Sequence, residues 1–457
     1  MTERDFAVDV VRRLRAAGYQ ALWAGGCVRD ELLGLSPKDY DVATDARPED
    51  VRKLFRRTIA VGASFGVVEV LGPRQEGKPL KIQVATFRSD VSYSDGRHPD
   101  AVVFSGPRED ALRRDFTING MFKDPLTEAI IDHVGGQEDL HAKVLRAIGD
   151  PSQRFEEDKL RMLRAVRMAT RFELTIESGT ADAIKAMAPQ MGVVSAERIA
   201  DELHKLLTDP RRARGMGLLF DLGLAAVILP EVVPMKGLPQ GPPSAPTGDL
   251  WDHTLKVLDL LGPDVSFPLA FAALLHDVGK PRTVGRTPDR YTFYYHEHVG
   301  KRLAGEMCLR LRLSNEERER IEWLVEKHQF LCEPRQMRTS KLKTTLVHPG
   351  IGELLALHRA DALASGRGTD HVEYCEQLLR EWSPADLDPP PLLTGNDLIG
   401  LGLEPGPLFK ELLDAVREAQ LDGTIRTTRE ALDLVEKRLG ELGYRCDADG
   451  KWSPPAG

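Results

Sequence analysis

The apolar pattern of the chain changes at about residue 150, and this change most strongly limits how the chain can fold. Residues 1–150 alternate short β-rich runs, such as LKIQVATFRS (80–89) and EAIIDHVGG (128–136), with helical pieces. From about residue 151 the strand signals disappear and apolar residues recur at helical spacing, as in LRMLRAVRMATRF (160–172). We therefore expect an α+β multidomain protein in which a mixed α/β head is followed by helical domains.

Two proline-rich stretches divide the helical part. VVPMKGLPQGPPSAPTGD (232–249) and SPADLDPPPLLTG (383–395) cannot continue a helix, because proline lacks the amide hydrogen and clashes with the preceding turn. A chain of 457 residues is also too long for one hydrophobic core. The sequence predicts four domains, at residues 1–150, 151–231, 250–382 and 395–457.

Composition limits where the protein works and what it binds. The net charge of −8 argues against a uniformly basic surface, although arginine-dense segments such as DPRRARG (209–215) leave room for local nucleic-acid-binding patches. The five cysteines are far apart, odd in number and without a CxxC pair, so neither a disulfide framework nor a cysteine zinc site is implied. No apolar run is long enough to cross a bilayer. We expect a soluble protein of the reducing cytoplasm with no membrane partner, and the sequence identifies no protein partner.

A pair of carboxylates in KDYD (38–41) is the first chemical signal. Asp39 and Asp41 lie two apart among strand-forming residues, so both would face one side of a sheet at about 6–7 Å. Like charges this close repel unless a cation lies between them, and hard oxygen ligands suit Mg²⁺. The alternative is an ordinary turn or helix cap near a strand end.

A glycine turn precedes this pair. Gly25 and Gly26 follow an apolar run, and Arg29 lies in the helical segment that comes next. Such a turn lets backbone amides approach a phosphate, and an arginine can add a charge-assisted contact. A phosphate cradle beside a magnesium site is typical of phosphoryl or nucleotidyl transfer.

A second polar pair occurs in RFEEDKLRMLRAVR (154–167). We expect Asp158 and Arg161 to be neighbours on one helix, at positions i and i+3. They could form an intrahelical salt bridge. Alternatively, the Asp acceptor and the Arg donors could read the polar edge of a nucleotide base.

Together these segments resemble a known family. GGCVRDELLG, KDYDVAT, YSDGRHP, RRDFTINGM, RFEEDKLRMLRAVR and VSAERIADEL occur in the order found in class II nucleotidyltransferases, from about residue 20 to 230. That family comprises tRNA CCA-adding enzymes, their CC-adding and A-adding relatives, and bacterial poly(A) polymerases. The resemblance implies a polymerase-beta-like nucleotidyltransferase head, a helical neck that selects the base and binds RNA, and a helical tail that grips tRNA.

The resemblance also implies roles for individual residues. Asp39 and Asp41 match the family's catalytic, magnesium-binding aspartates. The other matching positions would surround the nucleotide: Gly25, Gly26 and Arg29 at the triphosphate, Arg113, Arg114, Asp115 and Asn119 lining the site, Asp158 and Arg161 selecting CTP and ATP, and Arg164 and Arg167 extending the nucleotide- and RNA-facing surface.

One position departs from the family pattern. Where many members have a glutamate in a strand written IEVxTFR, this chain has KIQVATFR, with Gln83 at that place. An amide is a poorer magnesium ligand than a carboxylate. Either Asp39 and Asp41 are sufficient to hold the magnesium ion, or another acid is a third ligand. Asp115 and Glu69 are the candidates for that ligand.

The choice among family members rests on two further segments. VGASFGVVEV (61–70) lacks the GRR-type signature of the poly(A) polymerases, and residues 392–432 resemble the tail of bacterial CCA-adding enzymes. We expect addition of C, C and A to tRNA 3' ends from CTP and ATP, with release of pyrophosphate. A poly(A) polymerase and a partial CC-adding or A-adding enzyme remain alternatives.

A third set of residues resembles the HD superfamily of metal-dependent phosphohydrolases. An HD dipeptide followed by VGKP has a histidine upstream and an aspartate in a later helix, and the resemblance implies that these residues hold a divalent transition metal (Mn, Fe, Co, Ni or Zn). These four residues are His253, His276, Asp277 and Asp361. His296 and His328 match positions where some HD proteins bind a second metal, whereas His298 matches none.

The HD segment leaves several functions open. Some CCA-adding enzymes with such a domain remove phosphates from damaged tRNA ends, which suggests a cyclic phosphodiesterase or phosphatase activity. Alternatively, the domain is kept only as an RNA-binding scaffold. Two further hypotheses concern the whole protein. It could be an HD phosphohydrolase whose head only binds RNA, or a tRNA-binding module with no activity.

Overall fold

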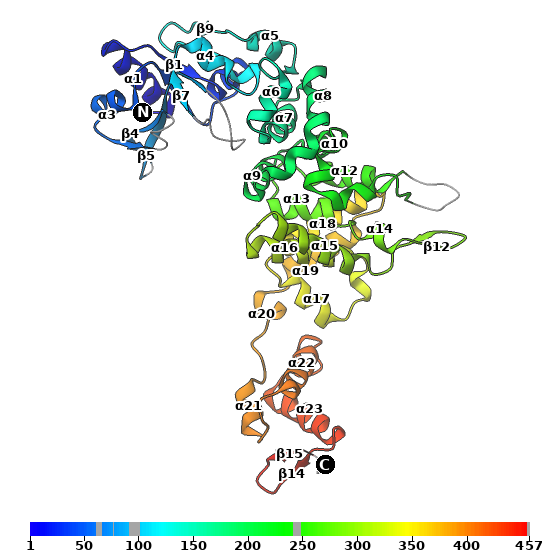
Figure 1. Cartoon of the computed structure of the whole chain (residues 1–457). Coiled ribbons are helices and arrows are strands. Elements are labelled where there is room, and N and C mark those ends of the chain that lie inside the picture. The colour runs from blue at the N-terminus through cyan, green and yellow to red at the C-terminus, as the bar shows by residue number, and fades with distance from the viewer. Residues whose placement is uncertain (61–65, 76, 91–100, 241–247, 455–457) are drawn as a thin grey trace. The chain divides into compact units, whose positions relative to one another are not determined.

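The computed structural model describes residues 1–60, 66–75, 77–90, 101–240 and 248–454 (Figure 1). Two sequence-based assignments fall partly or wholly outside these residues, namely YSDGRHP (93–99) and the first half of VGASFGVVEV. The chain forms two compact units, Met1–Pro234 with Leu309–Leu313, and Met235–Cys308 with Ser314–Gly457. The four-domain division stays a prediction.

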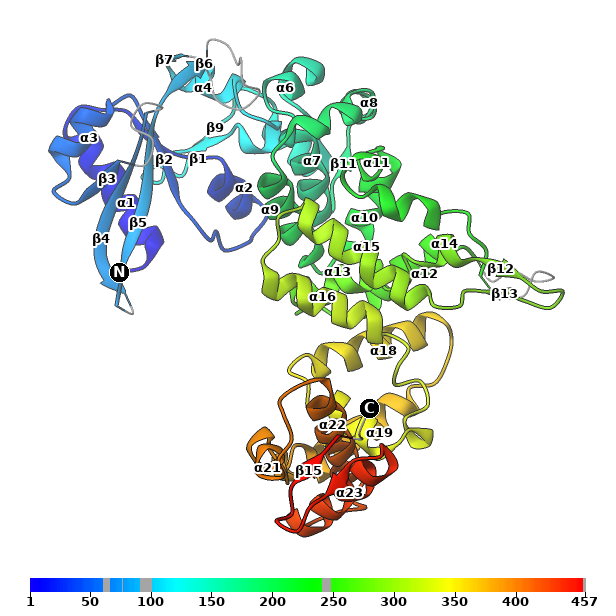
Figure 2. The same cartoon turned by 60° about the horizontal axis from the view of Figure 1, so that its bottom comes forward.

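A mixed seven-stranded sheet forms the head, as the β-rich pattern predicts. Its order is β3-β4-β5-β2-β1-β8-β9, with β2 parallel to β5 and the other neighbours antiparallel. The long strands β4 and β5 run side by side in both views (Figure 2). The strands are β1 (Ala21–Ala24), β2 (Asp41–Thr44), β3 (Thr58–Ala60), β4 (Val67–Gln75), β5 (Lys78–Thr86), β8 (Phe122–Lys123) and β9 (Ile130–Ile131), with a separate pair β6 (Arg88–Asp90) and β7 (Val102–Phe104).

Helix α1 (Glu3–Ala16) packs against the central strands β1, β2 and β5. It begins with a capping box between Thr2 and Asp5, and its buried face repeats at helical spacing. Phe6 on this face lies close to Gly72 of β4, where a side chain would collide with the ring. The other head helices are α2 (Gly26–Leu32), α3 (Pro48–Leu54), α4 (Pro107–Leu112) and α5 (Gly136–His141).

Helix α7 (Leu160–Arg171) is the centre of the helical bundle that follows the head. It contacts α9 (Ala196–Leu207) and α10 (Arg212–Asp221), and its apolar side chains are buried. The close approach of α10 to α9 requires Gly215, since a Cβ there would lie 2.5 Å from Leu206. The remaining helices are α6 (Pro151–Glu157), α8 (Ser178–Met187) and α11 (Ala225–Ile228).

The expectation that strands end near residue 150 is wrong in detail. β10 (Val144–Leu145) pairs in parallel with β11 (Thr175–Ile176). Two hairpins follow in the second unit, β12 (Gly285–Arg286) with β13 (Tyr291–Thr292), and β14 (Arg445–Cys446) with β15 (Trp452–Ser453). Strands of two residues are too short to show the alternation that identifies a strand in a sequence.

Helix α13 (Phe267–Leu275) forms the core of the second unit. All its residues except Pro268 are buried, and it contacts α12 (Leu250–Leu260), α16 (Asn315–Lys327) and α18 (Ile351–Ala364). The other helices are α14 (Lys280–Thr283), α15 (His296–Arg310), α17 (Thr339–Leu346), α19 (Asp370–Glu381) and α20 (Pro384–Leu387). No helix in the described ranges is long and apolar enough to cross a membrane.

The C-terminal helices have their own apolar cluster. Leu398, Leu412, Val416 and Val435 are buried in it, and Trp452 packs against it. These residues come from α21 (Gly395–Gly400), α22 (Pro407–Leu421), α23 (Thr428–Glu441) and β15.

Gly279 gives a test of how tightly the second unit is packed. A Cβ at this residue would lie 2.1 Å from the His296 carbonyl oxygen and 2.8 Å from the Gly300 nitrogen, so backbone must move to admit it. We expect Gly279→Ala to lower the free energy of unfolding by about 2 kcal/mol, measured by thermal unfolding. Gly352→Ala is the control, since a Cβ there meets nothing within 4 Å. Equal effects of both substitutions would contradict this account.

Candidate active sites

The Asp39 and Asp41 carboxylates lie at the start of β2. Asp41 is the first residue of the strand, and Asp39 precedes it in irregular backbone. Exposure alternates along the segment, because Tyr40 is buried against Trp23 while both aspartates reach solvent. The two carboxylates therefore share one side, as their spacing predicts.

Electrostatics at Asp41 favour a bound cation. Neighbouring protein atoms displace water from this carboxylate, although it keeps some contact with solvent, and this desolvation raises its pKa. The nearby Arg114 lowers the pKa, and the negative charge of Asp39 raises it further. A divalent cation between the carboxylates would remove this cost.

Gln83 lies directly beside Asp41 on the neighbouring strand. The register pairs Asp41 with Gln83 and Gln83 with Glu69, so the three residues form one row across β2, β5 and β4. Glu69 is two strands from Asp41, about 9–10 Å, and its carboxylate lies 3.1 Å from Lys81 Nζ. The other candidate for a third ligand, Asp115, is bound to Arg164 at 2.7 Å. Asp39 and Asp41 thus remain the acids best placed for a metal at the start of β2.

The glycine turn has a backbone that only glycine adopts easily. Gly25 has φ +71° and ψ −121°, and its amide donates to the Met121 carbonyl oxygen at 3.1 Å. A Cβ at Gly25 would lie 2.8 Å from Arg114 Nη1. The absence of a side chain at Gly25, the residue before α2, therefore leaves room for the Arg114 guanidinium.

Asp110, which the sequence analysis missed, fixes both arginines of the RRD motif. Its Oδ1 accepts from Arg113 at 2.6 Å and its Oδ2 from Arg114 at 2.9 Å. Burial alone would raise the pKa of Asp110, but the two guanidinium groups hold it below its ordinary value. The signal was present, because Asp110 precedes the arginines by three and four residues on a helix.

A buried polar network connects the head to α7. Asn119 accepts from Arg29 through Oδ1 and donates to Asp115 Oδ1 at 3.0 Å, and Asp115 Oδ2 accepts from Arg164 Nη2 at 2.7 Å. Arg29 also binds Asp30 and lies 4.2 Å from the Phe172 ring centroid. Its guanidinium is therefore held by protein groups behind the glycine turn, and its contact with a triphosphate stays a prediction.

The prediction that Asp158 and Arg161 share one helix is wrong. Helix α6 ends at Glu157, and Asp158 has φ −151° and ψ 104° before α7 begins. Its Oδ1 accepts from the Leu160 amide at 3.1 Å, a local bond that competes with helix continuation. In place of the intrahelical salt bridge considered as one alternative, Arg198 donates to Asp158 at 2.7 Å and Arg161 donates to Glu157 at 2.5 Å. Arg198 occurs in VSAERIADEL, but nothing in the spacing pointed to this partner.

A basic cavity of about 460 Å³ lies within the first unit. Lys38, which precedes the catalytic aspartate candidate Asp39, contributes to its wall together with Arg167. Arg167 is also paired with Glu202, so its guanidinium is held in place. The other lining residues are Arg171, Lys205, Thr208, Asp209 and Pro210.

The HD residues converge in the second unit. Asp277 lies at their centre, with Oδ2 3.2 Å from His276 Nε2 and Oδ1 3.3 Å from His296 Nε2 and 3.5 Å from His328 Nε2. His253 Nε2 lies 3.1 Å from Asp361 Oδ1 and 4.0 Å from Asp277 Oδ2. The ligand atoms of His253, His276 and Asp277 form one group, and those of Asp277, His296 and His328 form a second. Asp277 can therefore bridge two ions.

The histidine orientations fit metal binding. His276, His296 and His328 each direct Nδ1 to a backbone carbonyl oxygen at 2.6–2.7 Å, which leaves Nε2 free to bind a metal. In the described residues the buried His276 Nε2 and Asp277 Oδ1 have no hydrogen-bond partner. Burial lowers the pKa of His328, and a neutral imidazole is the form that ligates. Imidazole and carboxylate donors suit a transition metal.

Two other histidines lie outside this cluster. His298 has 60% of its side chain exposed and lies near Glu297 and Glu326. His358, which the sequence analysis missed, is buried with its pKa lowered to about 3, chiefly by burial. Its Nε2 donates to the Lys327 carbonyl oxygen at 3.2 Å and so supports the segment that carries His328.

Comparisons with known proteins agree with this arrangement. Family models match residues 21–146 (Poly A polymerase head domain), 173–235 (probable RNA and SrmB-binding site of polymerase A) and 250–365 (HD domain). An A-adding tRNA nucleotidyltransferase of Deinococcus radiodurans is 33% identical over 91% of this chain and 95% of its own length. The CCA-adding enzyme of Geobacillus kaustophilus is 41% identical, but the match spans 49% of this chain and about half (54%) of that relative.

A solved structure extends the likeness over nearly the whole chain. The Bacillus stearothermophilus CCA-adding enzyme in complex with CTP matches with a TM-score of 0.69 and 26% identity. The match covers 96% of this chain and 99% of that one.

The Asp115–Arg164 pair predicts a pH-dependent stability. Burial would raise the pKa of Asp115, but Arg164 and Asn119 lower it below its ordinary value. Its stabilisation is therefore complete above about pH 4 and is lost as pH falls through the lowered pKa. We expect Asp115→Asn to reduce the free energy of unfolding by about 3 kcal/mol at pH 7, and by less at pH 3, in urea titrations.

The matched control is Asp9→Asn, which removes an exposed carboxylate 3.9 Å from Arg13. This change should alter stability by less than about 1 kcal/mol. A loss for Asp115→Asn that is the same at both pH values would refute the ion-pair explanation.

The histidine cluster predicts a defined loss of metal. Protein stripped with chelator and reloaded with Mn²⁺ should retain less metal as His276→Ala than as wild type, measured by mass spectrometry of the metal after gel filtration. His298→Ala should retain the wild-type content, because its side chain lies outside both groups. Unchanged metal in His276→Ala, with unchanged circular dichroism, would rule out the site.

Proposed function

Because the chain belongs to the tRNA nucleotidyltransferase and poly(A) polymerase family, we propose that it adds C, C and A to tRNA 3' ends from CTP and ATP. The observation that carries this proposal is the Asp39 and Asp41 pair, which shares one side beside the Gly25 turn and Arg114. A carboxylate pair next to a phosphate-binding turn is the arrangement that nucleotidyl transfer needs.

The proposed reaction is an in-line displacement at the α-phosphate. Asp39 and Asp41 would hold Mg²⁺, which stabilises charge on the phosphate and lowers the pKa of the RNA 3'-hydroxyl. The Gly25–Gly26 turn and Arg114 bind and orient the triphosphate. The RNA 3'-oxygen bonds to the α-phosphorus as the bond to the β-phosphate oxygen breaks, and pyrophosphate leaves.

Base selection is assigned to the start of α7. Asp158 offers a carboxylate acceptor and Arg161 an array of donors, which suits the polar edges of cytosine and adenine. Arg198 holds Asp158 and is a positioning residue in this scheme. The break between α6 and α7 supports the assignment, because it leaves Asp158 outside a helix.

RNA phosphates fit the basic cavity beside Lys38. Its four cationic side chains can neutralise phosphates of a tRNA acceptor end. The C-terminal segment 395–457 is assigned to the rest of the tRNA.

The five cysteines are all free, which is consistent with a reducing cytoplasm.

The relatives differ in the number of nucleotides that they favour for this chain. The Bacillus stearothermophilus structure and the higher identity of the Geobacillus match favour CCA addition. The Deinococcus radiodurans relative, which matches over nearly its full length, favours an A-adding enzyme as the second candidate.

A second activity is proposed for the HD cluster, namely phosphohydrolysis at an RNA end. A cavity of about 590 Å³ opens at His253, Asp277 and Asp361 and is lined by Lys256, Lys280 and Arg367. The HD residues would hold one or two transition-metal ions, which supply hydroxide for attack on a phosphoester. The cationic side chains would bind the phosphate.

Substitution of the aspartate pair tests the main activity. Asp39→Ala and Asp41→Ala should each reduce nucleotide addition by at least about 10³-fold, because Glu69 is paired with Lys81 and Asp115 with Arg164 and neither replaces a lost carboxylate, while tRNA binding persists. Asp45→Ala, a third aspartate of the same segment, is the control. The assay uses tRNAs that end at the discriminator base, C, CC and CCA, with CTP and ATP supplied separately and together, and reads product lengths.

The products separate the alternatives. Extension of the discriminator-ended tRNA to CCA supports the proposal, whereas extension of the CC-ended tRNA alone identifies an A-adding enzyme. Long adenosine tails identify a poly(A) polymerase. Full activity of Asp39→Ala would exclude the proposed site.

A further inference from the structure

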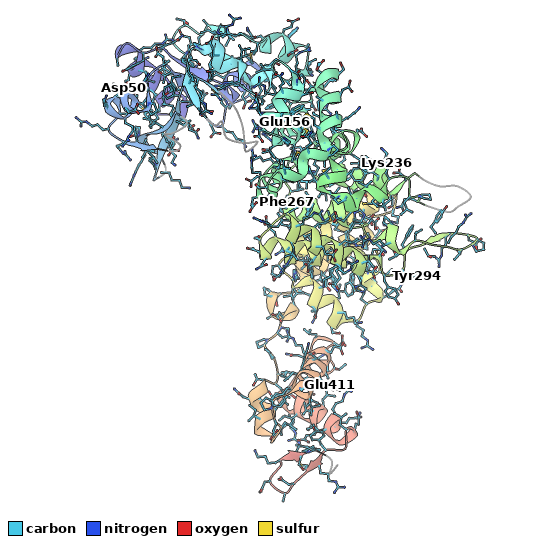
Figure 3. All side chains as sticks on the ribbon, in the orientation of Figure 1. Asp50, Glu156, Lys236, Phe267, Tyr294 and Glu411 are labelled. Atoms are coloured by element: carbon cyan, nitrogen blue, oxygen red, sulfur yellow. The ribbon has the colours of Figure 1, made fainter. Side chains whose placement is uncertain are left out.

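A hairpin next to the HD cluster carries an unusual group of side chains. β12 and β13 pair with Arg286 opposite Tyr291, and the hairpin projects from the helices of the second unit in both views. Figure 3 labels Tyr294 on the segment that leads from the hairpin to α15. A cavity of about 500 Å³ lies here, and we call five of its lining residues the hairpin surface: Arg290, Tyr291, Phe293, Tyr294 and Tyr295.

The hairpin surface adjoins the HD cavity. Lys280 and Gln329 line both cavities. Lys280 Nζ lies 2.7 Å from Asp277 Oδ2 and 5.2 Å from the Phe293 ring centroid, so one cation contacts the metal-binding aspartate and the aromatic surface. A ligand on the hairpin surface would therefore lie next to residues that border the HD cluster.

Two tyrosines of this surface are largely exposed to solvent. Tyr294 is 67% and Tyr295 72% exposed. Tyr295 also has φ +61°, a left-handed conformation that is costly for a bulky residue and is found most often at functional sites. It directly precedes His296, so the turn that exposes its ring also directs His296 into the metal cluster.

Positive charge accompanies these rings. Arg286 and Arg290 are exposed, and within the described residues their side chains form no ion pair. Glu297, which also lines the cavity, lies 3.5 Å from His296 Nδ1. Aromatic faces with adjacent cations bind single-stranded nucleic acid, because bases stack on the rings and phosphates meet the cations.

We propose that the hairpin surface binds the last unpaired nucleotides of an RNA 3' end and directs the terminal phosphate to the HD cluster. The inference rests on the proposed phosphohydrolase and adds the surface that would hold its RNA substrate. The bases would stack on Tyr294 and Tyr295, Arg290 would contact the phosphodiester backbone, and Lys280 would meet the terminal phosphate.

Crosslinking tests where the RNA lies without needing hydrolysis. The probe is a twelve-nucleotide RNA with a 3'-phosphate and 5-iodouridine at its last two positions, irradiated with full-length, chelator-treated protein. We expect crosslinked peptides to include residues 290–295. Tyr294→Ala should reduce this yield at least 5-fold, and Tyr294→Phe, which keeps the ring, should not. Crosslinks confined to other segments, or an equal yield from Tyr294→Ala, would overturn the proposal.

Kinetics of the metal-loaded protein give an independent readout. Tyr294→Ala should raise KM for the 3'-phosphorylated RNA about 10-fold, leave kcat near the wild-type value, and leave hydrolysis of p-nitrophenyl phosphate unchanged. Nucleotide addition to tRNA should also be unchanged. Equal loss with both phosphate substrates would overturn the proposal, because it would place the effect in the metal site.

The two hypotheses fail in different ways. If wild-type protein hydrolyses neither phosphate substrate, the phosphohydrolase assignment is wrong, and the crosslinks alone decide whether the surface binds RNA. If p-nitrophenyl phosphate is hydrolysed but the RNA is neither crosslinked at 290–295 nor cleaved, the phosphohydrolase stands and the RNA-end inference is refuted.

Discussion

The bond between the buried carboxylate of Asp115 and Arg164 is the interaction on which the candidate nucleotidyltransfer site depends. It joins the end of the RRD segment to α7, and Asn119 extends it to Arg29 behind the glycine turn. A buried carboxylate is stable as an ion only when a cation and hydrogen bonds compensate its lost hydration. The pair therefore fixes the position of α7, and with it the residues assigned to base selection, relative to the glycine turn and the Asp41 strand.

The second candidate site depends on a similar constraint, and a metal would there take the place of the arginine. Asp277 is almost completely buried, and three histidine Nε2 atoms lie within 3.2–3.5 Å of its oxygens. Backbone carbonyl oxygens bind the far side of each ring, so the rings are oriented in advance of metal binding. Gly279 makes this possible, because only a residue without a side chain lets the turn between α13 and α14 approach the start of α15 so closely.

Both sites would act on phosphates, and the surfaces beside them differ accordingly. Lysines and arginines without exposed aromatic rings line the cavity beside Lys38, which suits a helical acceptor stem held by its backbone. The hairpin surface adds exposed tyrosines, which suit unpaired bases. One chain would thus carry two kinds of RNA contact in two separate units.

The sequence by itself determined the family and the α+β class and predicted candidate residues for both sites, because motif spacing and apolar periodicity are local properties. It indicated Asp39 and Asp41 through their i, i+2 spacing and the HD cluster through its motif. The partners of charged residues were decided by the tertiary structure: Asp158 binds Arg198 instead of Arg161, and Asp110 holds both arginines of the RRD motif. The physical reason is that burial leaves each charge dependent on whichever opposite charge the fold brings within reach, and sequence distance does not report that proximity.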